Sequence, residues 1–246
     1  MSALDVRSFT VGPVQENSYI VRAASDSARA VMVDPGDEGP RLLAAASSLG
    51  VQIETVLITH CHFDHIGAVA HVARATGASV YCPEIERGVL ADVMSWVPPG
   101  FGPFESYEAD ATVAGGEALS LAGLDIEVIF TPGHSPGHVT YAIAPSRTDG
   151  EAEVPSAGDL PAPALLSGDV LFQGSVGRVD LPGGDWPTLE RSIGTLLKTF
   201  PAPTTVYPGH MGVTTLQRER DSNPFLAELR SAIHATAAPD AAAAAS

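Results

Sequence analysis

The chain has 246 residues, of which 45% are hydrophobic, and it carries a formal net charge of −16 at pH 7. This length suits one large α/β domain or two small ones, and the sequence lacks the apolar run of about 18–20 residues that spans a bilayer. The acidic balance and the absence of a Lys/Arg cluster argue against nucleic acid as a partner, because phosphate backbones are bound through cations.

Cysteine content and the N-terminal sequence bear on the cellular compartment. Cys61 and Cys82 are the two cysteines of the chain, which do not make a disulfide framework. The N-terminus lacks a basic region followed by an apolar one, so no secretory signal is expected. We therefore expect a cytoplasmic protein that binds no membrane, and the sequence leaves its oligomeric state open.

The first half of the chain alternates short apolar segments with helix-like patterns. Turn residues such as Asp34-Pro35-Gly36 separate them. The pattern predicts strands over 5–11, 17–22, 30–33, 54–59 and 79–82, and helices over 41–49, from about 65 to 76, and 84–94. Residues 96–107, rich in Pro and Gly and with four aromatic residues, predict a long loop that serves either as a lid or subunit contact, or packs on its own aromatic rings.

The second half returns to strands after Gly115-Gly116. The pattern predicts strands over 118–121, 124–130, 139–144, 165–166 and 204–207, a helix over 186–200, and one or two helices within 217–235. Residues 145–164 have no apolar periodicity and predict a flexible insertion, and the Ala-rich residues 236–246 predict a disordered tail. Strands followed by helices, twice, indicate a four-layer αββα sandwich in a single α/β domain over residues 1–235.

Four potential metal ligands follow the predicted strand 54–59 within six residues. His60 and His62 are two positions apart, so on extended backbone they point to the same side. Asp64 and His65 come where the chain turns into a helix, so they point elsewhere. Ligands aimed in two directions can hold two metal ions.

Three further candidate ligands, His134, Asp169 and His210, each follow an apolar strand and come directly after a glycine. Glycine lets the backbone approach a crowded centre. Active sites of layered α/β folds lie at strand ends, where loops converge on a rigid scaffold. We therefore expect all seven side chains to converge on one site.

These motifs carry a family resemblance. With His-x-His-x-Asp-His at 60–65, Pro-Gly-His at 132–134, Ser-Gly-Asp at 167–169 and Pro-Gly-His at 208–210, the sequence resembles the metallo-β-lactamase superfamily over about residues 5–235. The resemblance implies two divalent metal ions, one held by His60, His62 and His134, the second by Asp64, His65 and His210, with Asp169 bridging both. We expect zinc, with iron and manganese as alternatives, because histidine and carboxylate ligands accept all three.

The resemblance also assigns a role to Asp34, which matches a family acid that hydrogen-bonds a ligand histidine. Such a partner fixes the imidazole tautomer. The alternative is a plain turn residue of the Asp-Pro-Gly sequence.

Residues 171–185 and 218–225 are similar to the small hydroxyacylglutathione hydrolase (glyoxalase II) subfamily. This resemblance implies cleavage of a thioester of the S-2-hydroxyacylglutathione type by a bridging hydroxide, with Asp64 as the catalytic residue that orients it and accepts its proton. Arg178 and His138 are candidate substrate-binding residues, with packing at a strand end as the alternative for His138. Larger members carry a helical C-terminal domain that helps to bind glutathione; only 36 residues follow His210, so we expect that domain to be absent or reduced.

Three alternatives to this thioesterase remain. Persulfide dioxygenases resemble the sequence in the same motifs but use one iron, which here would be held by His60, His134 and Asp169. Hydrolysis of another ester, a lactone, a β-lactam or a phosphodiester is a nearer alternative, and the acidic surface weighs against the nucleases of the superfamily. A non-catalytic binding protein is expected to have lost ligands, and none is missing. The complete second ligand set favours the hydrolase over the dioxygenase.

Overall fold

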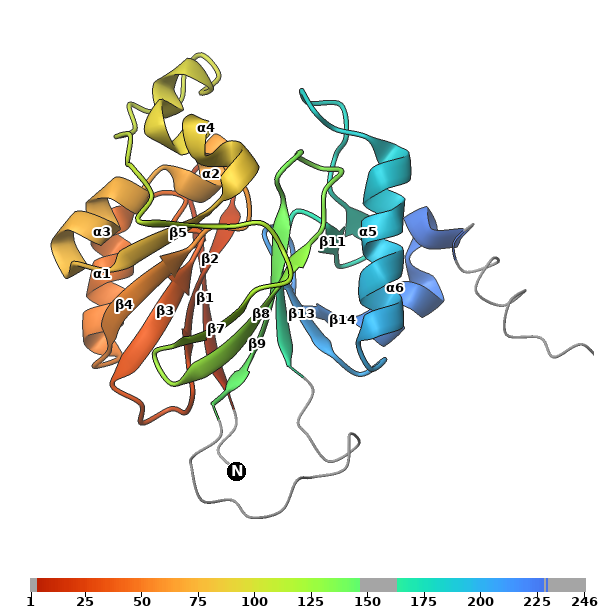
Figure 1. Cartoon of the computed structure of the whole chain (residues 1–246), viewed down its shortest axis with the longest axis horizontal. Helices are drawn as coiled ribbons and strands as arrows, with labels where there is room; N and C mark the ends of the chain where they lie inside the picture. Colours follow the sequence, from red (N-terminus) through yellow and green to blue (C-terminus); the bar gives the residue numbers. More distant parts are fainter. Residues whose placement is uncertain (1–3, 147–162, 228, 230–246) are drawn as a thin grey trace, which may run out of the picture.

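The computed structural model describes residues 4–146, 163–227 and 229 (Figure 1). Most of the expected insertion 145–164 and the whole expected tail 236–246 lie outside the described residues, so both stay predictions. Within the described part of the chain, every helix is too short or too polar to cross a bilayer.

The first sheet contains six strands that lie side by side in their order along the chain. Strands β1 to β3 are antiparallel, and β3 to β6 are parallel. The strands are β1 (Asp5–Val11), β2 (Glu16–Arg22), β3 (Arg29–Val33), β4 (Gln52–Leu57), β5 (Ser79–Pro83) and β6 (Ala111–Val113).

The second sheet also has six strands, in the order β14-β13-β10-β9-β8-β7. Its neighbours are antiparallel except for β10 and β13, which are parallel. The strands are β7 (Ala118–Leu121), β8 (Leu124–Phe130), β9 (Val139–Pro145), β10 (Ala164–Gly168), β13 (Thr205–Pro208) and β14 (Thr214–Thr215), with a separate hairpin of β11 (Leu171–Phe172) and β12 (Ser175–Val176).

Helices cover the outer face of each sheet, so four layers result (Figure 1). In the first half these are α1 (Gly39–Ser48), α2 (Phe63–Ile66), α3 (Val69–Thr76), η1 (Glu84–Glu86), α4 (Arg87–Ala91) and η2 (Val93–Ser95). In the second half they are α5 (Trp186–Thr199), α6 (Leu216–Ser222) and η3 (Pro224–Leu226).

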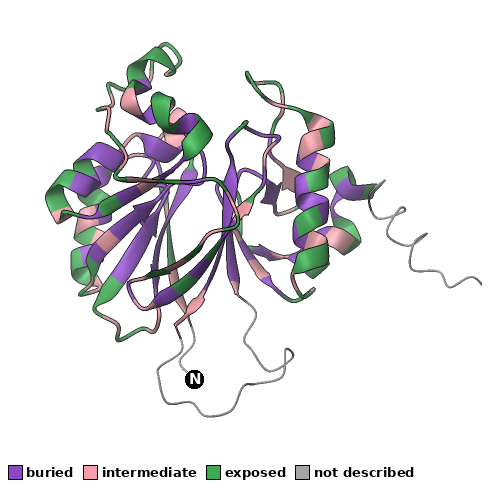
Figure 2. Cartoon of the chain, viewed as in Figure 1, coloured by how far each residue is buried: buried purple, intermediate pink, exposed green. Residues whose placement is uncertain are grey.

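The period of two along the strands divides the core into layers, because successive side chains point to opposite faces. On β2, Ile20 packs in the cluster between the first sheet and its helices, whereas Tyr19 and Val21 pack in the cluster between the two sheets. Leu124 and Ile126 of β8 reach the same central cluster from the second sheet. Figure 2 shows buried residues along the strands of both sheets. The predicted αββα sandwich is therefore confirmed.

Some elements differ from the prediction. The expected helix 84–94 is broken into η1, α4 and η2, because Asp92 leaves helical geometry (φ −141°, ψ 57°) and the N–H of Val93 donates to Ser106 Oγ. The helix after the ligand cluster divides at Gly67, since the Ala68 N–H donates to Pro35 O. Strands of two or three residues, such as β6, β11, β12 and β14, are too short to give a periodic signal.

Candidate metal centre

Three histidine rings from two loops form the first ligand group. His60 and His62 follow β4, and His134 follows β8. The Nδ1 atom of His62 lies 3.1 Å from His60 Nε2 and 2.8 Å from His134 Nε2. Ring nitrogens this close can share one metal ion, and they meet although His62 and His134 are 72 residues apart in the chain.

The second ligand group joins α2 to the loop after β13. Asp64, His65 and His210 each offer a ligand atom, and these atoms lie within 4.8 Å of one another. Asp64 Oδ2 lies 3.3 Å from His210 Nε2.

Asp169, in the turn after β10, lies between the two groups. Its Oδ2 atom is 3.5 Å from His134 Nε2 and 3.5 Å from His210 Nε2, and its Oδ1 atom is 3.4 Å from His65 Nε2. All seven candidate ligands therefore lie together at one end of the sandwich, where loops from both sheets meet.

The backbone and side chains around the site fix which nitrogen His134, His210 and His65 present. Nδ1–H of His134 donates to Arg178 O at 2.7 Å, and Nδ1–H of His210 donates to Gln15 O at 3.3 Å. Nδ1 of His65 lies 3.0 Å from Asp34 Oδ2. In each of these three cases Nδ1 is held by the protein, so Nε2 is the nitrogen that faces the centre and is available to a metal ion.

Asp34 lies where the family resemblance implies and also holds the end of β4. Its carboxylate accepts hydrogen bonds from Thr59 N–H (2.7 Å) and Thr59 Oγ–H (2.6 Å). Thr59 Oγ in turn lies 3.1 Å from His60 Nδ1, so Asp34 orients a ligand of each group.

Charge and burial in the site produce two kinds of histidine. Burial lowers the pKa of His60, and burial together with the nearby His134 lowers the pKa of His62 to about 4, so both rings are neutral at pH 7. Burial opposes charge on His65 too, but the carboxylates of Asp169 and Asp64 outweigh it and raise the pKa of His65. The neutral rings of His60 and His62 can each donate a nitrogen lone pair to a cation, and the carboxylates that raise the pKa of His65 would also favour a cation.

Two buried polar atoms indicate that a cation fits here. His65 Nε2 and Asp169 Oδ1 are both buried and have no hydrogen-bond partner among the described residues. Buried polar atoms are normally paired, and a divalent metal ion would satisfy both. Nitrogen and carboxylate ligands of this kind suit zinc, iron or manganese.

The two candidate substrate-binding residues, His138 and Arg178, differ in exposure. His138 is fully buried beneath the ligands, accepting the Asp169 N–H on Nε2 at 3.1 Å, with Nδ1 3.1 Å from Thr131 Oγ. It positions the Asp169 backbone and has no surface left for a substrate, so the packing alternative holds. The exposed Arg178 side chain pairs with Asp180, and Arg178 reaches the site through its backbone carbonyl.

Sequence reasoning did not find several polar residues around the centre. Asn17 Nδ2 donates to Met211 O at 2.9 Å, and Tyr19 Oη donates to Pro208 O at 2.6 Å, so β2 holds the loop of His210. Glu16 is fully buried with its nearest carboxylate oxygen 3.8 Å from His65 Nδ1, and burial raises its pKa. The available signal was a run of polar residues opening an otherwise apolar strand.

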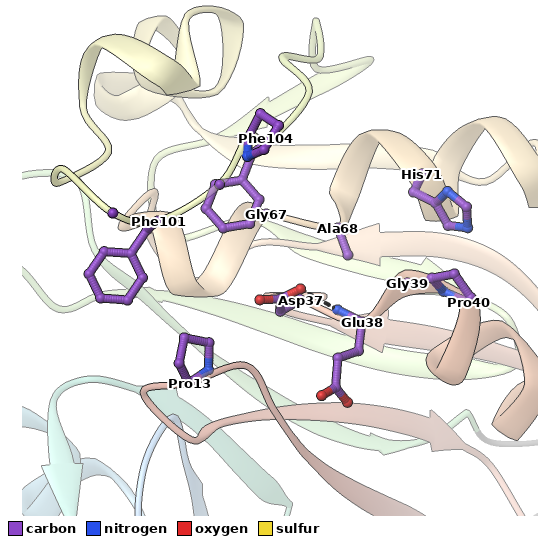
Figure 3. A pocket seen from close by; sticks show the side chains of 13 residues that line it. Pro13, Asp37, Glu38, Gly39, Pro40, Gly67, Ala68, His71, Phe101 and Phe104 are labelled. Carbon is purple, nitrogen blue, oxygen red and sulfur yellow. Dashed lines mark hydrogen bonds between the residues drawn. The ribbon is translucent and has the colours of Figure 1, made fainter.

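A pocket of about 400 Å³ lies between the turn after β1, the segment after β3 and the 96–107 loop (Figure 3). It is bordered by Pro13, Asp37 and the rings of Phe101 and Phe104. Phe63, between ligands His62 and Asp64, packs against Phe101 with ring centroids 4.7 Å apart. The 96–107 loop is thus anchored beside the ligand cluster by its aromatic rings, and its role as a lid or subunit contact stays a prediction.

Residues 11–147 match the family model described as the metallo-beta-lactamase superfamily. The chain belongs to this superfamily. As a member, it is a metal-dependent hydrolase in class, with histidine groups arranged to hold metal ions.

Two curated relatives of this metallo-β-lactamase superfamily member cover nearly its whole length. It is 37% identical to the "Probable metallo-hydrolase YqgX" of Bacillus subtilis (strain 168), over 89% of this chain and 96% of that one. It is 30% identical to the "Hydroxyacylglutathione hydrolase GloC" of Haemophilus influenzae (strain ATCC 51907 / DSM 11121 / KW20 / Rd), over 91% and 98%.

Solved structures of the superfamily give the same fold. The crystal structure of BLEG-1 B3 metallo-beta-lactamase superposes with a TM-score of 0.77 at 34% identity, covering 91% of this chain and all of that one. The crystal structure of TTHA1623 in a di-iron-bound form superposes with a TM-score of 0.65 at 37% identity, covering 89% and 100%.

Proposed function

We propose that this metallohydrolase cleaves a thioester of the S-2-hydroxyacylglutathione type at a centre of two divalent metal ions. The observation that carries the proposal is the position of Asp169, whose Oδ2 lies 3.5 Å from a histidine of each ligand group. A carboxylate shared by two complete groups suits two ions, and the 30% identity to GloC favours this substrate class.

The ions would be held by the seven converging residues, His60, His62, Asp64, His65, His134, Asp169 and His210. When bound, divalent metal ions lower the pKa of water to about 7 and polarise a carbonyl group. We expect zinc, although the di-iron form of TTHA1623 makes iron a direct alternative.

The remaining steps are proton transfer from the attacking water and departure of the thiol. Asp64 Oδ2 faces His210 Nε2 at 3.3 Å and would orient the attacking water and accept its proton. A thiol with a pKa near ~8.5 leaves as a thiolate without a strong acid. The mechanism therefore needs no proton donor, and no serine or cysteine nucleophile.

The test combines metal analysis of the purified protein with turnover of S-lactoylglutathione. Two ions per chain together with thioester cleavage are expected. A single iron with oxygen consumption on glutathione persulfide would contradict the proposal and favour the dioxygenase. Cleavage of a lactone or β-lactam with no thioester turnover would keep the hydrolase and replace its substrate.

Asp169→Ala gives the first mutational prediction. It removes the shared carboxylate, so we expect both activity and metal content to fall together. The loss of metal affinity should exceed the roughly 10-fold that even an outer partner of a ligand costs. Asp26→Ala, at an exposed turn distant in sequence from the ligands, serves as the control and should keep two ions. Full activity of Asp169→Ala would show that the bridging residue is misassigned.

A further inference from the structure

Glu86 is a buried carboxylate that joins the two loops of the first ligand group. Its side chain comes from η1, outside both loops, and only 5% of the residue is exposed. Oε2 accepts a hydrogen bond from Cys61 N–H at 2.5 Å, and Oε1 accepts one from Gly137 N–H at 2.8 Å and another from Ser135 Oγ–H.

Two of the three donors to Glu86 are immediate neighbours of the ligands. Cys61 lies between His60 and His62, and Ser135 directly follows His134. One carboxylate thus bonds to both loops, which approach each other from different sheets.

Gly137 also packs closely against the Glu86 side chain. A Cβ atom at Gly137 would lie 2.7 Å from Glu86 Cγ, so the loop packs directly on this side chain. The second ligand group depends on other residues: Asp34 holds His65, and Asn17 holds the loop of His210.

We propose that Glu86 is a positioning residue that sets the separation of the first ligand group, His60, His62 and His134, and thereby the affinity of that group for its metal ion. His62 Nδ1 lies 3.1 Å from His60 Nε2 and 2.8 Å from His134 Nε2. Their spacing depends on how closely the two loops approach. The proposal rests on the two-metal centre of the proposed function but not on its substrate.

Glu86→Gln is the test. Glutamine has nearly the same size but one acceptor oxygen, and its NH2 group cannot accept from a backbone N–H. Either Cys61 or Gly137 therefore loses its acceptor, and one loop loses its link. We expect the Zn²⁺ affinity of the first group to fall about 10–100-fold, the usual effect of removing a residue that orients metal ligands, while the second group keeps its affinity.

The measurement is competition for Zn²⁺ by a chelator, followed in the metal-free full-length protein. His134→Ala and His210→Ala identify which step of the titration belongs to which group. Glu84→Gln is the matched control, because Glu84 lies in the same turn, is exposed, and loses the same charge. A titration of Glu84→Gln should match the wild type.

A selective loss at the first group supports the positioning role. Unchanged affinity at both groups, or an equal loss at both, would overturn it. A wild type that binds two ions yet cleaves no thioester would remove the proposed substrate and leave the role of Glu86 standing, so the two failures are distinguishable.

Discussion

At the residue scale, the glycines next to the ligands are set by contact distances. A Cβ atom at Gly209 would lie 2.3 Å from Asp169 Oδ1, and one at Gly133 would lie 2.2 Å from Leu189 N. Gly133 also has a φ of +127°, which side chains rarely adopt. The ligand loops can therefore approach the centre this closely only because the residue before the ligand is glycine and has no side chain.

Gly133→Ala should lose about 2 kcal/mol or more of unfolding free energy, because backbone strain and overpacking each cost about 1–3 kcal/mol. It should also weaken the metal held with His134. Denaturant unfolding and metal content measure both effects. Gly88→Ala is the matched control: it lies in α4 with open space at its Cβ position and should be neutral or slightly stabilising. Equal stability of the two variants would contradict the steric argument.

At the element scale, strand β2 supports a loop from the far end of the chain. The Asn17 N–H donates to Gly209 O at 2.7 Å, and the Tyr19 hydroxyl reaches Pro208 O at 2.6 Å. Both acceptors precede His210. The first sheet thus helps to place a ligand that the second sheet carries.

Tyr19→Phe should cost about 1–2 kcal/mol of unfolding free energy, because it leaves a buried carbonyl without one of its donors. We expect the second metal to dissociate faster, whereas the first is unaffected. Metal release to a chelator measures this difference. Tyr207→Phe removes a hydroxyl from the ring that packs against Tyr19 at 5.7 Å and is the control. Faster release of the first metal instead would refute the assignment.

At the scale of the whole molecule, the histidines give the metal-free protein a stability maximum near pH 6.5. Burial lowers the pKa of His60 and of His138 below 6.5, the ordinary value for histidine, and lowers that of His62 to about 4. Below pH 6.5 the unfolded chain takes up protons that the folded chain refuses. As the pH decreases below 6.5, the unfolding free energy should therefore decrease by about 1.4 kcal/mol per pH unit for each such histidine.

The opposite sign applies to His65 and His210, whose pKa values the neighbouring carboxylates raise against the effect of burial. Their stabilising contribution is complete below pH 6.5 and is lost as the pH rises through their folded-state pKa values. Denaturant unfolding from pH 4 to 8 tests both limbs. His138→Asn should make the acidic limb less steep, because it removes one of the three buried histidines. An acidic limb that is flat in the wild type would be incompatible with neutral buried rings.

The sequence was most informative where a regular period or a fixed spacing exists. The alternating residues of β8 and the spacing of His60, His62, Asp64 and His65 could be interpreted without coordinates. Glu86 could not, because its partners lie 25 and 51 positions away and nothing in a single sequence pairs them. The spacing of His138 from His134 likewise did not reveal that its ring lies under Asp169.

The ligand groups draw on both sheets, and this has a mechanical consequence. An ion bound between His62 and His134 would close a loop of 72 residues and cross-link one half of the sandwich to the other. Metal affinity would then depend on how well the two sheets pack together. A substitution that disturbs the apolar core between the sheets, far from any ligand, would therefore first appear as a loss of bound metal. Conversely, loaded protein would separate its halves more slowly than stripped protein.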